Sequence, residues 1–361
     1  MPDDYAKLCQ QATYTLTGHG HRTVRVLLDG LAGTDPATAA DIYGVGPVIN
    51  DFETELAGLL GKPAAVFFPS GVMAQQIALR LWCDAAGNPS VAYHPLCHLE
   101  IHEQDAIRAL HRLEPVCLGQ ADRLFTLADL MAVDPAPACL LIELPQREIG
   151  GQLPAWDDLV AMADYCRAHG IRTHLDGARL FETLPYYRKT AAEIAALFDS
   201  VYVSFYKGLG SVAGAMLAGE ADFMAEATIW KRRHGGDLIS LYPYTIAARH
   251  WLHRRADRME AYWRAAQTVA AELNAIPGVD TVPRQPVCNM FHVYFDAPVA
   301  TVEAILGDIT RRYDLAIAPG LRPVDQDHCK AEMSFGDAYD LVPADLRQAA
   351  LAAFAQRWAE R

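Results

Sequence analysis

Apolar runs alternate with amphipathic stretches along most of the chain. Short runs rich in Val, Ile, Leu and Phe at 64–68, at 138–143 and from Ser200 onward predict buried strands. Between them, apolar residues recur at helical spacing, as at 156–169, where a glycine follows, and at 190–198. Helices that regularly alternate with strands predict an α/β fold with a mainly parallel sheet and right-handed crossovers.

The pattern divides the chain into three segments. Residues 1–40 form an N-terminal arm with a basic stretch, and residues 41–275 form a large domain that closes with long helices over 220–275. A Pro-Gly pair follows Ile276 and marks a boundary. Beyond it, strands and helices alternate over 276–361, which predicts a small C-terminal α/β domain.

A lysine stands where the run from Ser200 ends. The sequence there reads Phe-Tyr-Lys-Gly-Leu-Gly, and the lysine is Lys207. The two glycines let the backbone turn tightly after a buried strand. Partial desolvation would favour the neutral amine of Lys207 and make it nucleophilic, as a Schiff-base lysine must be. The alternative is a solvated lysine that caps a strand.

An acidic residue ends the preceding predicted strand. The strand pattern at 171–176 finishes on Asp176, and Arg179 follows after a glycine. Pyridoxal 5'-phosphate needs a lysine for its aldehyde, an acid for its pyridine nitrogen and anchors for its phosphate. Asp176 and Lys207 could be the first two, and Arg179 could hold a substrate carboxylate with its guanidinium fork.

A phosphate anchor is predicted where a helix follows the strand at 64–68. Ser70, Gly71 and Val72 stand at this strand-to-helix turn. The unpaired N–H groups and the dipole of such a helix N-terminus attract an anion. In the simpler interpretation, Ser70 serves only as a helix N-cap.

Two of these segments carry a family resemblance. Residues 174–181 read HLDGARLF and residues 204–210 read SFYKGLG, and together they resemble the threonine aldolase family. That family belongs to the fold-type I pyridoxal-phosphate enzymes, among the aromatic-amino-acid β-eliminating lyases. The resemblance implies a large domain with a mainly parallel seven-stranded sheet and a small C-terminal α/β domain. It also implies a homodimer or homotetramer with the site at the subunit interface.

The resemblance assigns the cofactor-binding roles. Lys207 would bind the aldehyde, and Asp176 would pair with the pyridine nitrogen. Ser204 would join Ser70, Gly71 and Val72 in the cofactor site. Val72 stands where the family commonly has threonine, so the phosphate would lose one hydrogen bond of about 1 kcal/mol.

A histidine-rich stretch supplies the candidate base. Residues 98–104 match the family segment whose histidine stacks on the cofactor ring, so His98 is the expected stacking residue and a candidate base. His102 stands where the family often has an aromatic residue and is the second candidate. His94, Cys97, His98 and His102 could instead ligate a metal, although their spacing matches no standard zinc pattern.

Further departures concern the substrate. The family binds the substrate carboxylate near a Ser-Asp step, where this chain has Leu28 and Asp29. Tyr43 begins a Tyr-Gly loop like the one that the family presents to the neighbouring subunit's site. Leu144 replaces an asparagine, and Glu332 lies in a strand that often carries an arginine. These differences point to an altered substrate, with Arg179 taking more of the carboxylate binding.

Composition narrows the possible partners and location. The 361 residues are 52% hydrophobic and carry a net charge of −13, which argues against binding to nucleic acid or anionic membranes. No apolar run reaches the roughly 18 residues of a membrane span. No signal core follows the acidic N-terminus, so we expect a cytoplasmic protein. The eight cysteines form no CxxC pair and are expected to be reduced thiols.

The resemblance implies an activity as well as a fold. The expected reaction cleaves the Cα–Cβ bond of a β-hydroxy-α-amino acid, such as threonine or allo-threonine, into glycine and an aldehyde. Another reaction on the same cofactor remains open, namely β-elimination, racemisation or aldol addition to an unusual acceptor. Two different classes of protein also remain open: a non-catalytic binding protein that retains the fold, and a metal-binding protein built on 94–103.

Overall fold

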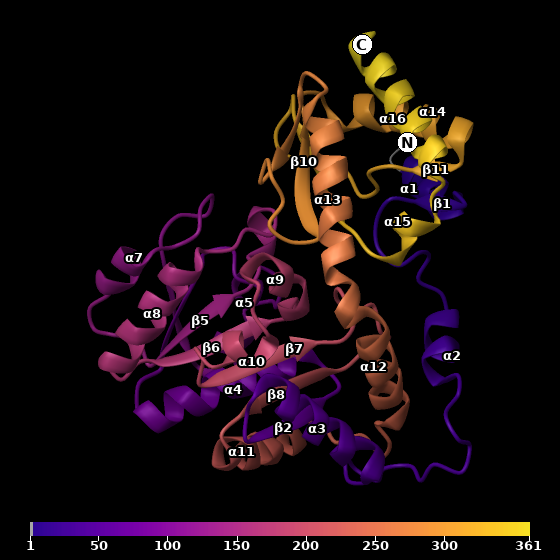
Figure 1. Ribbon diagram of the computed structural model, residues 1–361. Coiled ribbons are helices and arrows are strands. Elements are labelled where there is room, and N and C mark those ends of the chain that lie inside the picture. The colour runs from indigo at the N-terminus through magenta and orange to yellow at the C-terminus, as the bar shows by residue number, and fades with distance from the viewer. Residues whose placement is uncertain (1–2) are drawn as a thin grey trace. The chain divides into compact units, whose positions relative to one another are not determined.

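The computed structural model describes residues 3–361, which belong to two compact units (Figure 1). The larger unit contains residues 24–148 and 153–257. The smaller unit contains the N-terminal residues up to Thr23, residues 149–152 and residues 258–361.

The larger unit is built on a seven-stranded sheet in the order β2-β8-β7-β6-β5-β3-β4. Only β8 runs antiparallel to its neighbours β2 and β7, so the sheet is mainly parallel, and the expected architecture is confirmed. The strands are β2 (Ala64–Phe68), β3 (Ser90–Tyr93), β4 (Glu114–Cys117), β5 (Cys139–Glu143), β6 (Arg172–Gly177), β7 (Ser200–Ser204) and β8 (Ala215–Gly219).

Helices cover both faces of this sheet, because successive side chains of a strand point to opposite sides. Phe67 packs against Phe52 of one helix, while Phe68 joins the cluster formed with Ala74 and Ile77 of another. The helices of the larger unit are α2 (Arg25–Leu31), α3 (Pro47–Leu60), α4 (Gly71–Ala86), α5 (His98–Ile101), α6 (Ala106–His111), α7 (Leu127–Met131), α8 (Trp156–Ala168), α9 (Leu180–Tyr187), α10 (Ala191–Ala195), α11 (Ala221–Arg233) and α12 (Tyr242–Arg255).

Local sequence signals explain several helix ends. Helices α7 and α10 each begin with a capping box, formed by Thr126 with Asp129 and by Thr190 with Glu193. Gly87 directly follows helix α4 and adopts φ +61°. That left-handed conformation favours glycine because a Cβ atom would be strained there.

The sheet register brings chemically active side chains together. Glu143 at the end of β5 pairs with Asp176 on β6, and Asp176 pairs with Tyr202 on β7. All three residues are buried. Because the parallel strands end at the same edge, the loops after β2, β5, β6 and β7 meet there, which is where α/β sheets bind ligands.

The smaller unit has its own core. Its four-stranded antiparallel sheet has the order β12-β13-β10-β9, and β1 pairs with β11 in a separate parallel pair. Phe291 stacks on Phe335 inside it, at 5.7 Å between ring centres. The elements are α1 (Asp3–Gln11), β1 (Tyr14–Thr15), α13 (Met259–Asn274), β9 (Val279–Val282), β10 (Met290–Phe295), α14 (Val299–Tyr313), β11 (Leu315–Ala316), β12 (Arg322–Pro323), β13 (Cys329–Ser334), α15 (Asp337–Leu341) and α16 (Ala344–Ala359). Two short 3-10 helices, η1 (Arg147–Ile149) and η2 (Ala256–Arg258), complete the chain.

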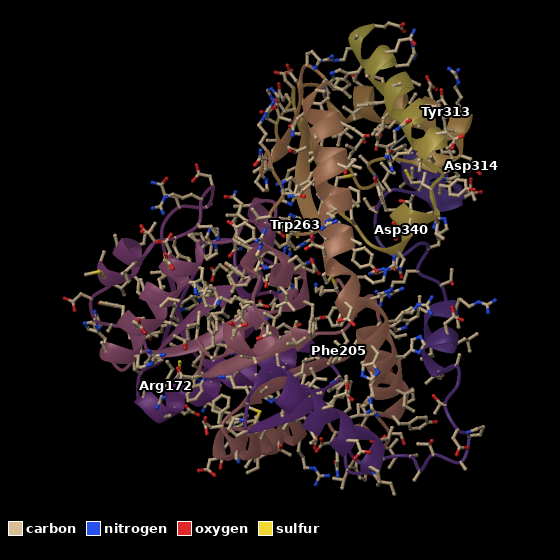
Figure 2. The ribbon with its side chains drawn as sticks, in the orientation of Figure 1. Arg172, Phe205, Trp263, Tyr313, Asp314 and Asp340 are labelled. Atoms are coloured by element: carbon tan, nitrogen blue, oxygen red, sulfur yellow. The ribbon has the colours of Figure 1, made fainter. Side chains whose placement is uncertain are left out.

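Figure 2 draws the side chains, and two that it labels show contacts that hold strands of the larger unit in place. Phe205, just beyond β7, packs against Phe52 and Phe67 at 5.2 and 6.1 Å between ring centres. Arg172, at the start of β6, pairs with Asp199 at 2.9 Å.

All eight cysteines are free, and only Cys117 is exposed. In the described part of the chain, no helix has the length and apolar character needed to cross a bilayer.

Candidate active site

A pocket opens at the carboxyl edge of the sheet, entirely within the larger unit. It lies where the loops after β2, β5, β6 and β7 meet, so it contains residues that are far apart in the sequence. Its lining consists of Val72, Gln75, His98, Glu103, Glu143, Asp176, Ala178, Arg179, Tyr202, Tyr206 and Lys207. Five of the residues singled out by the sequence pattern therefore share one pocket: Val72, His98, Asp176, Arg179 and Lys207.

Asp176 is a buried carboxylate held by neutral donors. The Gln75 side-chain amide donates to Oδ2 at 3.0 Å, and the Ala178 backbone N–H donates to Oδ1 at 3.1 Å. Burial raises the pKa of Asp176, and the hydrogen bond from Gln75 opposes this. A cationic N–H would relieve the cost of the buried charge, and a protonated pyridine nitrogen carries such a group.

Glu143 adds a second buried carboxyl beside the first. Its Oε2 accepts a hydrogen bond from the Gln146 side chain at 3.1 Å, and its Oε1 accepts one from the Arg147 backbone at 3.3 Å. Burial, and then the charge of Asp176, raises the pKa of Glu143. A raised pKa favours the protonated, neutral form of Glu143, and a cationic group placed beside the two carboxyls would favour their charged forms instead.

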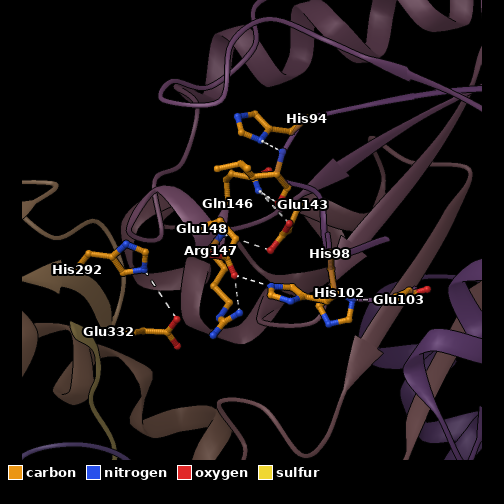
Figure 3. Close-up of polar contacts among 11 residues, drawn as sticks. His94, His98, His102, Glu103, Glu143, Gln146, Arg147, Glu148, His292 and Glu332 are labelled. Atoms are coloured by element: carbon orange, nitrogen blue, oxygen red, sulfur yellow. Dashed lines mark hydrogen bonds and ion pairs between the residues drawn. The ribbon is translucent and has the colours of Figure 1, made fainter. Parts of the chain in front are cut away.

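His98 has a fixed orientation (Figure 3). Its Nδ1 lies 3.0 Å from Oε1 of Glu103, whose other oxygen accepts a hydrogen bond from Gln76 at 2.8 Å. A carboxylate only accepts, so Nδ1 carries the proton and donates to it. That tautomer leaves Nε2 of His98 as the nitrogen that can take a proton from a substrate.

His102 lies next to His98 but has different partners. The two rings are 5.2 Å apart, and Nε2 of His102 lies 2.8 Å from Oε1 of Glu148. The same Glu148 oxygen accepts a hydrogen bond from Arg147 at 2.6 Å, as Figure 3 shows. The His102 side chain is about one-third exposed and does not line the pocket, so it lies farther from the pocket floor than His98 does.

Lys207 and Arg179 are the basic side chains of the pocket lining. Nζ of Lys207 lies 5.3 Å from the ring centre of Tyr206, which also lines the pocket. Arg179, at the start of α9, is largely buried, and its Nε lies 4.0 Å from the carboxylate of Glu182. A lysine, an arginine and two acidic side chains thus line one pocket, a set suited to a zwitterionic ligand.

The start of α4 provides an anion site at the same edge. Its first-turn N–H groups have no partner within the helix, and the Ser70 side chain makes no capping hydrogen bond. Gly71 is packed so tightly that a Cβ atom there would lie 2.0 Å from the Tyr202 hydroxyl. One further polar atom, Oε1 of Gln75, is buried and has no hydrogen-bond partner among residues 3–361. These residues fit pyridoxal phosphate, which needs an acid, a lysine, an anion site and polar contacts around its ring.

The remaining sequence candidates lie outside this pocket. Ser70 precedes α4, and Ser204 is buried at the end of β7. Tyr43 is half exposed and lines a different surface hollow, with Lys231 and Arg232. Asp29 lies on α2 near Arg25.

The structure also places the residues of the metal-site alternative, and Glu332, which stands in the strand where the family often has an arginine. Across residues 3–361, no group of three or more His, Cys, Asp or Glu side chains is arranged to hold a metal ion. His94 instead contacts the Arg123 carbonyl through Nε2 at 2.9 Å, and Cys97 is fully buried. In the smaller unit, Glu332 pairs with His292 at 3.8 Å, a contact also drawn in Figure 3.

Several pocket residues carry only a weak sequence signal or none. Gln75 lies three positions after Val72, on the same helical face, and that spacing was the available signal. Glu103 comes five residues after His98, beyond a four-residue helix, so no simple periodicity links the two. Tyr202 and Tyr206 looked like parts of an apolar strand and its loop.

Comparison with known proteins gives a family and several relatives. Residues 37–297 match the family model described as beta-eliminating lyase. The chain is 25% identical over 251 residues to low-specificity L-threonine aldolase 1 of Arabidopsis thaliana. That alignment covers 66% of this chain and 69% of the Arabidopsis protein.

Two solved structures resemble the chain over nearly its whole length. One is a candidate L-allo-threonine aldolase from Listeria monocytogenes EGD-E, with 50% identity and a TM-score of 0.97. The other is a candidate aromatic amino acid beta-eliminating lyase/threonine aldolase from Exiguobacterium sp. 255-15, with 51% identity and a TM-score of 0.96. Each comparison covers 98% of this chain and 99% of the other.

Proposed function

The chain belongs to the beta-eliminating lyase family, and from that premise we propose that it is a pyridoxal-phosphate-dependent aldolase. Its substrate would be a β-hydroxy-α-amino acid such as threonine or allo-threonine, and its products glycine and an aldehyde. The observation that carries the proposal is the convergence of Lys207, Asp176, Arg179 and His98 on one pocket.

The cofactor would be held at three points. Lys207 would bind its aldehyde carbon. Asp176 would accept a hydrogen bond from the pyridinium nitrogen, so that its buried charge would gain a cationic partner. The N–H groups at the start of α4 would receive the phosphate. When bound, the cofactor supplies an electron sink for the charge that bond cleavage leaves on Cα.

The substrate would be oriented by charge. The guanidinium of Arg179 offers a planar fork for the α-carboxylate, and its side chain is only 11% exposed. The nearby carboxylate of Glu182 limits the positions that this guanidinium can take. A fixed fork would hold the amino acid with its β-carbon toward the histidines.

His98 would act as the base. Glu103 holds Nδ1–H, so Nε2 would remove the proton from the β-hydroxyl as the Cα–Cβ bond breaks and the aldehyde leaves. A positioned general base contributes about 10²- to 10⁴-fold in rate. Protonation of Cα then completes glycine, and His102, which is held by Glu148 and is the more exposed of the two rings, would exchange protons between His98 and solvent.

A product assay tests the proposal. The purified protein, loaded with pyridoxal phosphate, should convert threonine or allo-threonine into equal amounts of glycine and acetaldehyde. Lys207→Ala should abolish this conversion, whereas Lys189→Ala, at a partly exposed lysine of the same unit, should not. Release of a 2-oxo acid and ammonia would assign the chain to elimination chemistry instead.

We also infer that the chain works as an oligomer. Exposed apolar residues gather around the loop that begins at Ile42, and the Tyr43 backbone N–H donates to the Ile239 carbonyl at 3.1 Å. The exposed members of this group are Ile42, Tyr43, Val45, Ile229, Leu238 and Ile239. Exposed apolar side chains grouped in this way point to an interaction surface. Sedimentation equilibrium should give a dimer or tetramer, and Tyr43→Asp should shift the mass towards the monomer; a wild-type monomer would contradict the inference.

A further inference from the structure

We propose that Arg255 is a positioning residue for Lys207. It binds the loop that carries the lysine, and it acts through the backbone carbonyl of Leu209. The inference rests on the proposed function, because it concerns the lysine that would bind the cofactor. Arg255 lies outside the pocket lining and sets where the amine lies.

The sheet itself does not fix the position of Lys207. Strand β7 ends at Ser204, which pairs with Ala215, the first residue of β8. Residues 205–214 therefore form the loop between the two strands, here called the lysine loop. Lys207 is the third residue of this loop, so its place depends on the contacts that the loop makes.

Bonds within the lysine loop define its shape. The Phe205 N–H donates to the Gly214 carbonyl at 3.1 Å, and the Ser211 N–H donates to the Phe205 carbonyl at 2.7 Å. The Gly210 N–H donates to the backbone carbonyl of Lys207 at 2.8 Å. Gly210 adopts φ +66°, which allows the tight turn directly after the lysine. Phe205 anchors the beginning of the loop through its packing in the core.

Arg255 anchors the other side of that turn. Its Nη1 donates to the Leu209 carbonyl at 2.7 Å, and the residue is only 4% exposed. A hydrogen bond from a charged donor is stronger than one between neutral groups, more so in a buried setting. Because Leu209 lies two residues after Lys207, a shift of this carbonyl is transmitted to the lysine through two peptide planes.

The guanidinium of Arg255 is itself fixed. It lies over the Trp251 ring, 3.8 Å from the ring centre. The Trp251 indole N–H donates to the Val26 carbonyl of α2 at 3.2 Å. Helix α2 approaches so closely that a Cβ atom on Gly30 would lie 2.9 Å from Cβ of Ala247 and 3.1 Å from the Trp251 indole nitrogen. The ring that orients Arg255 therefore has little room to move.

A second buried charge contacts the loop next to the lysine. The Glu182 carboxylate occupies the space where a side chain on Gly208 would begin, since a Cβ atom there would lie 1.8 Å from Oε1. Glu182 is almost fully buried. The lysine loop is thus contacted by Glu182 at Gly208 and by Arg255 at Leu209, the two residues that follow Lys207.

Three variants of the full chain test the role of Arg255. Arg255→Met removes the charged donor but keeps most of the side-chain volume, and Arg255→Lys keeps a donor but loses the planar fork. Arg254→Met is the matched control, because Arg254 is exposed on the same helix. Amide exchange of 205–214 is measured without cofactor. With pyridoxal phosphate, the pH titration of the bound-cofactor absorption and kcat per bound cofactor are measured.

We expect Arg255→Met to speed exchange in the lysine loop and to move the midpoint of the absorption titration. Its kcat should fall by about 10- to 100-fold, as misplacement of a reacting group does, with KM little changed. Arg255→Lys should recover part of each effect, and Arg254→Met should match the wild type. Wild-type loop exchange and titration in Arg255→Met would overturn the proposal, as would a kcat loss explained entirely by a smaller folded fraction.

These readouts separate the proposal from the proposed function. If the wild type binds the cofactor but makes no aldehyde, the proposed function fails, while exchange and titration still decide the role of Arg255. If the wild type is an aldolase and Arg255→Met leaves loop exchange and titration unchanged, only the positioning role fails.

Discussion

Gly71 offers a sharp test of how the start of α4 is built. In Gly71→Ala the added Cβ would lie 2.0 Å from Oη, 2.6 Å from Cζ and 2.8 Å from Cε2 of Tyr202. Ordinary contact between carbon atoms needs about 3.5 Å. Either the phenol or the first turn of α4 must therefore move by about 1 Å.

The helix end should give way rather than the ring. Tyr202 is 2% exposed and sits on β7, which has β6 on one side and β8 on the other. Overpacking of this kind costs about 1–3 kcal/mol, which corresponds to about 5- to 150-fold in an equilibrium constant. If the N–H groups of the first turn move, the cost appears mainly as a higher Kd for pyridoxal phosphate.

Cofactor titration and chemical unfolding of the cofactor-free protein measure the two possible costs. Gly58→Ala is the matched control, because apart from its chain neighbours and its own helix backbone its Cβ would meet no atom of residues 3–361 within 4 Å. It should stabilise the protein by about 0.5–1 kcal/mol and leave the cofactor Kd unchanged. Combining Gly71→Ala with Tyr202→Phe removes the contact at 2.0 Å but leaves Cζ at 2.6 Å, so the Kd should recover only in part.

A wild-type Kd in Gly71→Ala would refute this reasoning. So would a double variant whose change in Kd equals the sum of the two single changes, because contacting residues should show coupling. A lower free energy of unfolding with an unchanged Kd would mean that Tyr202 yields and the helix end does not.

Three further predictions follow from the charges of the larger unit. Glu103→Gln removes the carboxylate that orients His98 and should lower kcat by about 10²-fold with little change in cofactor affinity; an unchanged kcat in steady-state assays would argue against His98 as the base. Asp176→Asn should raise the free energy of unfolding of the cofactor-free protein at pH 7, because burial raises the pKa of Asp176 and makes its charged form costly. The same variant should be a weaker catalyst. Calorimetry measures the stability and kinetics the activity, and a less stable variant would contradict the predicted gain in stability. Burial lowers the pKa of His111 to about 4 from its usual 6.5, with the charges of His234 and Arg80 adding to the effect. The unfolded chain therefore takes up this proton first, so the stabilisation present above pH 6.5 is lost as the pH falls towards 4, by at most about 1.4 kcal/mol per pH unit. Urea unfolding at several pH values should show a smaller loss in His111→Leu, and equal losses would count against this origin.

The α/β fold could be predicted from the sequence because the apolar runs, the helical spacing and the turn residues all indicate the same alternation of strands and helices. The apolar run at 64–68 became β2 with the same bounds, and α4 begins at Gly71, as the turn after that run suggested. Asp176 and Lys207 could be placed at one sheet edge because the carboxyl ends of parallel strands meet there. The seven-stranded sheet itself came from the family resemblance, because strand order cannot be read from local periodicity.

The fine structure of the site was less accessible, because it depends on tertiary packing. Glu103 reaches His98 because the chain turns back at Gln104 and Asp105, which adopt φ +52° and +61°. No glycine signals that turn. His102 meets Glu148, which is 46 residues away in the sequence, through the loop after β5. The contact of Arg255 with Leu209 likewise joins a helix and a loop that no sequence spacing connects.

The most direct test of the account is to find which lysine binds the cofactor. The protein is incubated with pyridoxal phosphate, its visible absorption is recorded, and the link is reduced with borohydride before peptide mapping. We predict a visible band in the wild type and in Lys189→Ala, its loss in Lys207→Ala, and cofactor mass on the peptide that contains Lys207. A band that survives in Lys207→Ala, or cofactor mass only on another lysine such as Lys62 or Lys231, would contradict the account.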